Sequence, residues 1–433
     1  MNTATLSTDQ APPLNIPLSF YAFAPLALVV AGTLLAAQGT QLLTTHWLPH
    51  TIAWVHLGTL GFLGAVMLGS LYQMVPVVIG ASVPAIRVAH GVALLLALGT
   101  TALVAGLTLG IGNATLAGAA LLLVAVLGFL LPVGTALLRA AGGGATRTGM
   151  RGAVLCLLAL VLIGVRLAWG HATGALPEAR TSWLAAHVAL GLIGWVGGLL
   201  TAVSWQVVPM FYLTQPFPLT WQRILSQLVP ASTLLAAVLA LVQVPLVGIL
   251  LAALPAAIAV WLVQPILLTR LILQRRRRRR DPTLRFWWLA LACSPLTLTC
   301  AVLAFLTDWP PAPLLFGFLA ILGWAGAIVH GMLTRIVPFL TWFHRFTAVA
   351  GLAEVPPMKQ LLPDAQIAWN WRVHTATVVT GTLAILTQND VLARLTGGLM
   401  SATGLLLAGA LVSTLLRARP TCPKGVAQST LAP

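Results

Sequence analysis

Histidine is the residue type in this sequence best suited to do chemistry within apolar surroundings. The sequence holds nine histidines and only seven acidic residues. None of the acidic residues lies deep in a predicted membrane span. An imidazole without a carboxylate neighbour stays neutral, and a neutral imidazole is a good ligand for haem iron or copper. Histidines inside apolar stretches are therefore the first candidates for a cofactor site.

A motif that occurs three times gives these histidines a common frame. Its members are a glycine, an aromatic residue, a second glycine, a long polar side chain and a proline. The copies are Gly61, Phe62, Gly64, Gln73 and Pro76; Gly194, Trp195, Gly197, Gln206 and Pro209; and Gly323, Trp324, Gly326, Arg335 and Pro338. The proline follows the first glycine by 15 residues each time. Glycines three apart are ordinary packing residues in membrane helices, but the shared frame indicates a repeated architecture.

Two histidines occupy nearly the same depth in this frame. His56 lies five residues before the first glycine of its copy, and His187 lies seven residues before. At the rise of an α-helix their depths differ by only about 3 Å, whereas His330 lies about 18 Å deeper than His56. His56 and His187 are therefore predicted to serve one site, as ligands of haem b or of copper. The alternative is that each imidazole only binds a backbone carbonyl of a neighbouring helix.

Arginines at the same predicted face could complete a haem site. Arg166 and Arg180 fall close in depth to the two histidines and could hold haem propionates through charge-assisted hydrogen bonds. The alternative for Arg166 is that its side chain only reaches up to the membrane interface.

A second polar set lies near the opposite ends of the repeated stretches. Gln73, Gln206 and Arg335 occupy one register position, with His90 and His374 just across the connecting loops. These residues could form an anion-binding vestibule or a hydrogen-bonded ring that fixes helix ends. We prefer the second interpretation.

The elements that carry these residues are predicted to be membrane helices. Hydrophobic residues make up 59% of the 433 positions and charged residues 7%, far less charge than a soluble domain needs. Twelve apolar runs are long enough to span a bilayer: about 17–37, 51–79, 88–110, 114–139, 150–172, 183–212, 222–242, 246–273, 285–306, 314–343, 367–387 and 391–416. The motif falls on the second, sixth and tenth runs. The sequence thus predicts a single all-α transmembrane domain of three four-helix units, about 17–140, 148–274 and 284–416, in pseudo-threefold order.

The basic excess predicts the orientation of the chain. The formal net charge is +16, and most basic residues, including the run Arg275 to Arg280, follow even-numbered runs. By the positive-inside rule both termini are cytoplasmic, with 417–433 as a cytoplasmic tail, and the arginines contact anionic lipid rather than nucleic acid. We expect a bacterial inner membrane. The lack of a deep carboxylate disfavours a cation-coupled carrier.

This outline resembles the haem-copper oxidase subunit I family, and it is similar to NnrS, a family of haem- and copper-containing membrane proteins linked to nitric oxide stress. In the oxidases the second-helix histidine binds low-spin haem and the sixth-helix histidine binds copper; His56 and His187 are the matching positions. The region from Gln227 to Thr233 lacks the paired copper histidines of that family. Gly191 replaces its tyrosine, and Phe316 to Leu319 replace its tenth-helix histidines. The resemblance therefore implies a diverged member without oxygen-reducing activity.

Two functional hypotheses follow. The first is a haem- or copper-binding redox protein, or one related to nitric oxide. The second is a cofactor-free channel or carrier for a small neutral or anionic solute, using Gln73, Gln206, Arg335, His90 and His374. A structural role beside a respiratory or electron-transfer partner is a third alternative.

Overall fold

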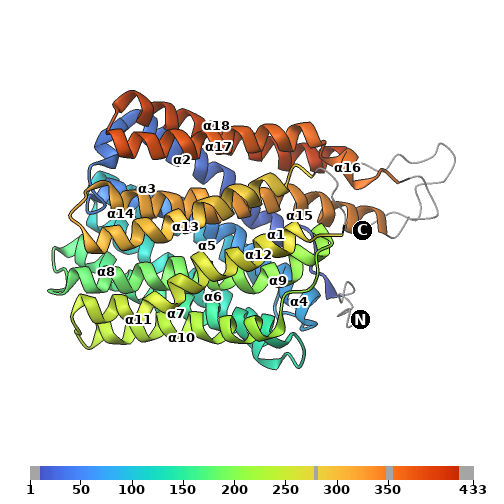
Figure 1. Ribbon diagram of the computed structural model, residues 1–433, viewed down its shortest axis with the longest axis horizontal. Coiled ribbons are helices and arrows are strands. Elements are labelled where there is room, and N and C mark those ends of the chain that lie inside the picture. Colours follow the sequence, from blue (N-terminus) through green and yellow to red (C-terminus); the bar gives the residue numbers. More distant parts are fainter. Residues whose placement is uncertain (1–9, 277–280, 348–354, 419–433) are drawn as a thin grey trace.

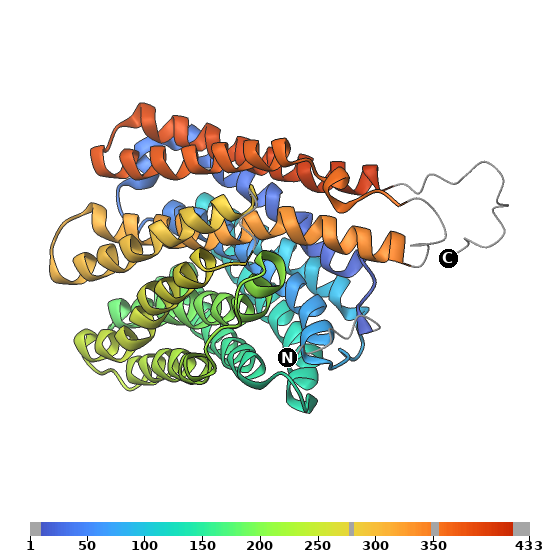
Figure 2. The same ribbon diagram turned by 45° about the vertical axis from the view of Figure 1, so that its right-hand side comes forward.

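The structure, a computed structural model, describes residues 10–276, 281–347 and 355–418. Every regular element of this part is a helix. Eleven helical stretches within it are long and apolar enough to cross a membrane, and they lie side by side along one axis (Figures 1 and 2). Many large apolar side chains are exposed on the outside. The chain is thus a multi-pass membrane protein. Arg277 to Arg280 and residues 419–433 of the predicted tail lie outside the described residues.

The first stretch of the described chain, up to Arg139, contains six α-helices and two other helical segments. They are α1 (Asn15–Tyr21), α2 (Phe23–Gln38), the 3₁₀ turn η2 (Gly39–Leu43), α3 (Pro49–His56), the π-helical segment η3 (Leu57–Gly64), α4 (Ala65–Ile79), α5 (Val88–Leu109) and α6 (Gly112–Arg139).

Two further stretches, residues 144–273 and 284–417, contain the remaining helices. The first of these contains α7 (Gly144–Thr173), α8 (Arg180–Val188), the π-helical η4 (Ala189–Gly197), α9 (Gly198–Tyr212), α10 (Leu219–Leu241), α11 (Leu246–Ile258), the π-helical η5 (Ala259–Val263) and α12 (Gln264–Leu273). The other contains α13 (Leu284–Leu306), α14 (Pro311–Phe318), the π-helical η6 (Leu319–Gly326), α15 (Ala327–Phe346), α16 (Met358–Leu361), α17 (Asp364–Thr387) and α18 (Asp390–Arg417). The 24-residue helix α17 is less apolar than the eleven, since polar residues such as Asn370 and Arg372 interrupt it.

Each copy of the motif forms the same local structure. The segments η3, η4 and η6 end at its second glycine, namely Gly64, Gly197 and Gly326, and an α-helix continues from there. In a π-helix each backbone N–H bonds the carbonyl five residues earlier. A Cβ added at the second glycine would lie 3.0, 3.2 or 2.6 Å from the carbonyl oxygen of Thr59, Leu192 or Ile321, five residues back in each case. The second glycine is therefore explained by the π-helical backbone.

The first glycine of each copy is explained by the neighbouring helix. A Cβ added at Gly61 would lie 2.5 Å from the Ala27 Cβ on α2. At Gly194 and Gly323 it would lie 2.8 and 2.9 Å from the sulfur of Cys156 on α7 and of Cys293 on α13. An α-helix that precedes the motif in the sequence thus packs directly on each copy.

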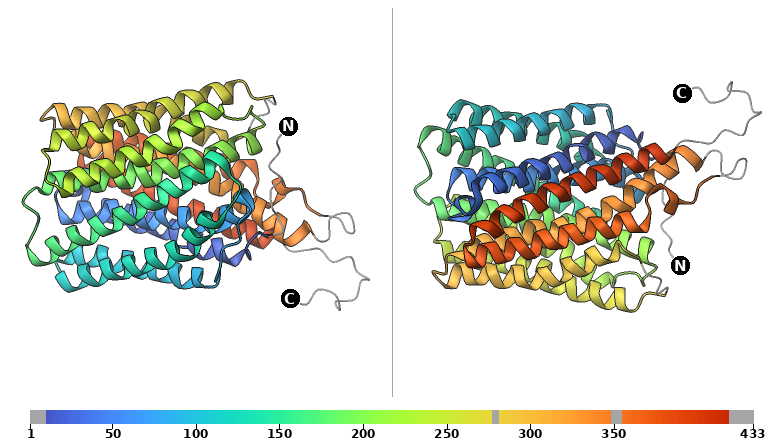
Figure 3. Two further views of the ribbon diagram at one scale, coloured as in Figure 1. Left: turned by 90° about the horizontal axis from the view of Figure 1, so that it is seen from below. Right: turned by 90° about the horizontal axis from the view of Figure 1, so that it is seen from above.

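The first and last long helices close the bundle. Helix α2 packs against α18, and the blue and red helices lie side by side in Figure 3. Asp390 accepts hydrogen bonds from the backbone and hydroxyl of Thr40, and Arg394 donates to the carbonyls of Ala36 and Ala37. The end of α2 therefore meets the start of α18, so the described chain begins and ends at the same end of the bundle.

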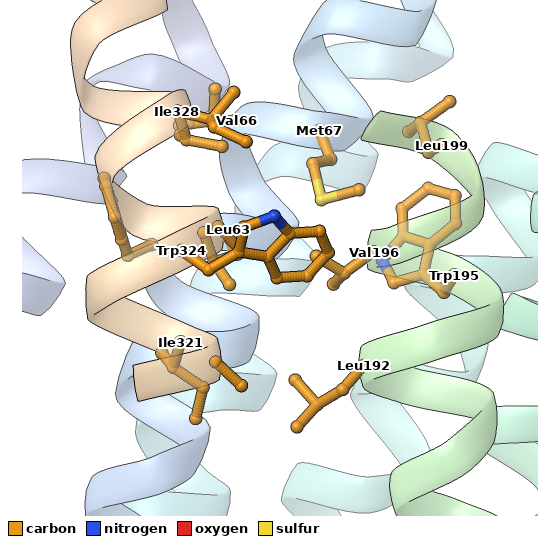
Figure 4. Close-up of a cluster of buried hydrophobic side chains, with 14 of the residues drawn as sticks. Leu63, Val66, Met67, Leu192, Trp195, Val196, Leu199, Ile321, Trp324 and Ile328 are labelled. Carbon is orange, nitrogen blue, oxygen red and sulfur yellow. The ribbon is translucent and has the colours of Figure 1, made fainter. Parts of the chain in front are cut away.

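The three motif copies meet at the centre of the molecule. Figure 4 shows apolar side chains of η3 and α4, of η4 and α9, and of η6 and α15 pointing toward one another, among them Met67, Trp195 and Trp324. Four residues of this apolar cluster, Val66, Met67, Leu199 and Ile328, also line a cavity of about 70 Å³. Its lining comes from five register positions, 5, 6, 9, 10 and 13 residues after the first glycine, and all three copies contribute at each. These residues are Val66, Met67, Ser70, Leu71 and Met74; Leu199, Leu200, Val203, Ser204 and Val207; and Ile328, Val329, Met332, Leu333 and Ile336, together with Trp287.

Candidate cofactor site at paired histidines

The structure brings His56 and His187 together. Their ring centroids are 6.3 Å apart and the ring planes meet at 33°. His56 is the last residue of α3 and His187 lies near the end of α8, so each side chain is held directly before a π-helical segment. Both rings are half-buried. Neither histidine lines the central cavity.

The partners of the two rings leave nitrogen lone pairs available. The Nδ1 atom of His56 lies 2.7 Å from the carbonyl oxygen of Ile52. Because a carbonyl only accepts, the proton is on Nδ1 and Nε2 keeps its lone pair. The buried Nδ1 of His187 has no hydrogen-bond partner among the described residues. A Cβ added at Gly164 of α7 would lie 3.1 Å from Cε1 of His187, so that glycine makes room for the ring.

The spacing of the rings fits a metal between them. Two metal–nitrogen bonds of about 2 Å, with about 1 Å from each nitrogen to its ring centre, total about 6 Å for a linear arrangement. The observed 6.3 Å agrees with that value. No group of three or more His, Cys, Asp or Glu side chains suited to a metal occurs within the described ranges. Two imidazoles suffice for haem iron, however, because the porphyrin supplies four nitrogens. The cavity at the bundle centre does not border the pair, so a porphyrin would enter from the exposed side of the rings.

Two arginines come from the helices that adjoin or carry His187: Arg166 lies in α7 and Arg180 at the start of α8. Arg166 donates to the carbonyl oxygen of Ala175 at 3.1 Å and lies 6.0 Å from the Trp183 ring centre. Arg180 lies 4.3 Å above the Trp47 ring. His171 is within electrostatic range of His56 and Arg180. Among the described residues neither arginine forms an ion pair with a carboxylate, so both retain their charge for an anionic group.

The charge of Arg180 also acts on His46, in the loop before α3. Burial, and then the positive charge of Arg180, lower the pKa of His46 below its ordinary value of 6.5. His46 also contacts the Trp47 ring, at 4.6 Å between centroids. Burial and the charge of Arg180 therefore favour neutral His46.

The contact between His56 and His187 has an apolar counterpart elsewhere in the bundle. His56 and His187 lie five and seven residues before the first glycines of copies one and two. Phe318 and Trp54 occupy the same two positions in copies three and one, and their ring centroids are also 6.3 Å apart. The same junction between neighbouring copies is therefore filled by histidines in one place and by apolar aromatic rings in another.

The second predicted polar set is divided in the structure. Gln73 is buried, and its Oε1 has no partner in the described part of the chain. Gln206 donates to the hydroxyl of Thr146 at 3.1 Å. Arg335 forms an ion pair with Asp281 at 3.3 Å and donates to the Phe211 carbonyl. These three residues precede the last cavity-lining position of their helices by one residue.

The two histidines of that set lie elsewhere. His90 is exposed at the start of α5. His374 is buried, with its ring centroid 5.1 Å from that of His330. This pairing was missed from the sequence, because His374 was expected near a helix end. The sequence signal that could have indicated it is the spacing of Asn370 and His374, two polar residues four apart that share one face of a helix.

Comparison with known proteins gives no further guide: no protein-family model and no curated protein matches this chain.

Proposed function

We propose that this chain is a haem-binding inner-membrane protein, in which His56 and His187 would hold one haem b. Copper between the same imidazoles is the alternative occupant. When bound, the iron would supply redox chemistry or binding of a small ligand such as nitric oxide. The observation that carries the proposal is the 6.3 Å separation of two half-buried imidazoles.

The chain's own residues would have three tasks at this site. His56, held by Ile52, presents Nε2, and His187 provides the opposing ring. Arg166 and Arg180 would offset the charges of two propionates. The apolar segments η3 and η4 lie in the chain between the two histidines and the residues that line the central cavity. They would limit access of water from the cavity to the pair.

The proposed fold is that of a diverged haem-copper oxidase subunit I, with twelve helices in three units around a pseudo-threefold axis. The shared register positions of the cavity lining support this order. Counting α17 as a span gives twelve. The basic loops support an orientation with both termini cytoplasmic. The missing second copper and haem ligands support a role without oxygen reduction.

An absorption spectrum tests the proposal. Protein purified from haem-replete cells should show a Soret band and about one haem per chain. The band should be lost in the His56→Ala, His187→Ala double variant and kept in His90→Ala, which removes an exposed histidine at the start of α5. A colourless wild-type protein without iron or copper would refute the proposal.

The central cavity favours a second candidate function, passage of a small neutral solute. Only Ser70 and Ser204 are polar among the sixteen residues that line it. At about 30 Å³ per water molecule in the liquid, its volume corresponds to about two water molecules. An apolar lining disfavours an anion.

Flux through reconstituted vesicles separates the two functions. A Val329→Trp variant should fill the cavity and abolish flux of a small neutral solute, while any Soret band remains. Arg335→Gln should also reduce flux if the polar ends form the entrance. Unchanged flux in both variants would exclude this path.

A further inference from the structure

The imidazoles of His330 and His374 form a second pair, independent of the first. The side chains are 0% and 1% exposed, and they come from α15 and α17. Their ring centroids are 5.1 Å apart with the planes at 79°. Phe286 of α13 packs against both rings, at 4.9 and 5.8 Å.

The hydrogen bonds of His374 fix its tautomer. Its Nε2 lies 3.1 Å from the carbonyl oxygen of Leu322, in the π-helical segment η6. A carbonyl only accepts, so the ring carries its proton on Nε2. In the other two copies the equivalent carbonyls, of Leu60 and Ile193, accept from the backbone N–H of Ala65 and Gly198. In η6 the corresponding N–H, on Ala327, is directed to Trp324 instead. His374 therefore supplies a donor that the third π-segment needs.

His330 has the same tautomer for a related reason. Its Nε2 lies 2.8 Å from Oδ1 of Asn370. The Asn370 Nδ2 donates to the carbonyl oxygen of Gln366 at 3.0 Å, which fixes the amide so that Oδ1 is the acceptor. The proton of the His330 ring is thus on Nε2 as well.

Both Nδ1 atoms consequently keep a free lone pair in the protein interior. Neither has a hydrogen-bond partner among the described residues. An unpaired buried polar atom is unfavourable, and protonating either ring would add a charge in apolar surroundings. Donation of the other ring N–H to a carbonyl or amide oxygen is also how proteins orient histidines that bind metals.

We infer that His330 and His374 bind one copper(I) ion through their Nδ1 atoms. With the bond lengths used above and both Nδ1 atoms facing the ion, centroids 5.1 Å apart correspond to an angle of about 116° at the metal, between the trigonal and the tetrahedral values. Ions that favour this geometry with imidazole include zinc and copper(I). With no carboxylate paired to either ring in the described structure, the singly charged ion is the less costly one to bury.

Copper(I) titration under reducing, anaerobic conditions against a chromophoric chelator tests this inference. Wild-type protein should take up one tightly bound ion per chain at this site. A His330→Gln, His374→Gln double variant should lose it, with affinity lower by at least about tenfold. Glutamine keeps a donor near the Nε2 position for Leu322 and Asn370 but has no lone pair at Nδ1.

Two controls make the result specific. His90→Gln should bind copper as the wild type does. The His56→Ala, His187→Ala variant should lose its Soret band but keep this ion, so failure of the haem proposal and failure of the copper proposal are distinguishable. X-ray absorption of the copper-loaded wild type, which does not depend on any variant folding, should show two imidazoles. No uptake by the wild type, equal uptake by the glutamine variant, or a spectrum without two imidazoles would overturn the inference.

Discussion

Replacing the second glycine of each motif copy by alanine should destabilise the protein in a graded order. A Cβ at Gly326 would lie 2.6 Å from the Ile321 carbonyl oxygen, at Gly64 3.0 Å from that of Thr59, and at Gly197 3.2 Å from that of Leu192. Ordinary contacts begin at 3.4 Å. Because the obstacle is the backbone of the same helix, no rotamer change can relieve it. The π-segment itself must deform.

The size of the effect follows from two opposing terms. Overpacking costs about 1–3 kcal/mol, whereas glycine to alanine in a helix gains about 0.5–1 kcal/mol. The shortfall from ordinary contact is 0.8 Å at Gly326, so the net loss there should be about 1–2 kcal/mol. At Gly197 the shortfall from ordinary contact with the Leu192 carbonyl oxygen is only 0.2 Å. The Cβ there would also lie 2.8 Å from the Val260 side chain, which can move aside. We expect Gly326→Ala to be the least stable, then Gly64→Ala, with Gly197→Ala near neutral.

Gly317 provides a matched control in the same long helix as Gly326. A Cβ there meets nothing within 4 Å, so Gly317→Ala should be neutral or slightly stabilising. Thermal unfolding in detergent, followed by circular dichroism at one fixed scan rate, gives the ranking even if unfolding is irreversible. If Gly326→Ala unfolded at the same temperature as Gly317→Ala, the explanation of the motif by π-helical carbonyls would be wrong.

Three further predictions concern other parts of the bundle. Gly397→Ala should lose about 1–3 kcal/mol in the same unfolding assay because its Cβ would strike the backbone of α2, whereas Gly398→Ala, which meets nothing within 4 Å, should not. Asp281→Asn should lower thermal stability by removing the ion pair with Arg335, and Asp308→Asn, on a loop, should not. Folding favours neutral His46, so its contribution to stability should be complete above pH 6.5 and lost as the pH falls below that value. Arg180→Gln should raise the pKa of His46 in an NMR titration, and an unchanged pKa would show that burial alone lowers it.

Much of the helical layout could be predicted from apolar run length. The predicted spans 51–79 and 285–306 correspond to helical stretches Pro49–Ile79 and Leu284–Leu306. Run length works here because a bilayer requires about 20 apolar residues and satisfies no backbone polar group. The sequence also predicts that His56 and His187 lie at nearly the same depth, because both positions are counted from the first glycine of the motif.

The π-helical segments and the second histidine pair could not be predicted in this way. A run of Leu, Gly, Phe and Ala has the same hydropathy whether its hydrogen bonds close over four residues or five. His374 was expected near the start of a helix, yet α17 begins at Asp364. Ten residues place it about 15 Å along the axis, at the depth of η6, where it meets Leu322 and His330. His90 lies on the exposed face of α5, whereas its neighbours Ala89 and Val92 lie on the buried face.

The aromatic counterpart of the proposed haem site allows a test in which the fold should survive. Equivalent positions on helices around an axis point the same way, but residues two apart on a helix are about 200° apart, so they face opposite neighbours. The residue five positions before the first glycine of one copy therefore faces the residue seven positions before the first glycine of the next copy. His56 and His187 make that contact, and Phe318 and Trp54 make it at another junction with the same 6.3 Å spacing.

Packing alone thus permits apolar rings at this junction, and the histidines serve another purpose. The His56→Phe, His187→Trp variant copies the aromatic pair into the histidine junction. It should purify as a monodisperse protein with wild-type helix content and no Soret band, and a His56→Phe single variant should retain at most a one-ligand spectrum. Thermal stability should stay equal or rise, because a half-buried polar pair is replaced by apolar surface. Misfolding of this variant, with the Ala pair folding normally, would contradict the equivalence of the two junctions. A retained Soret band would place the haem elsewhere.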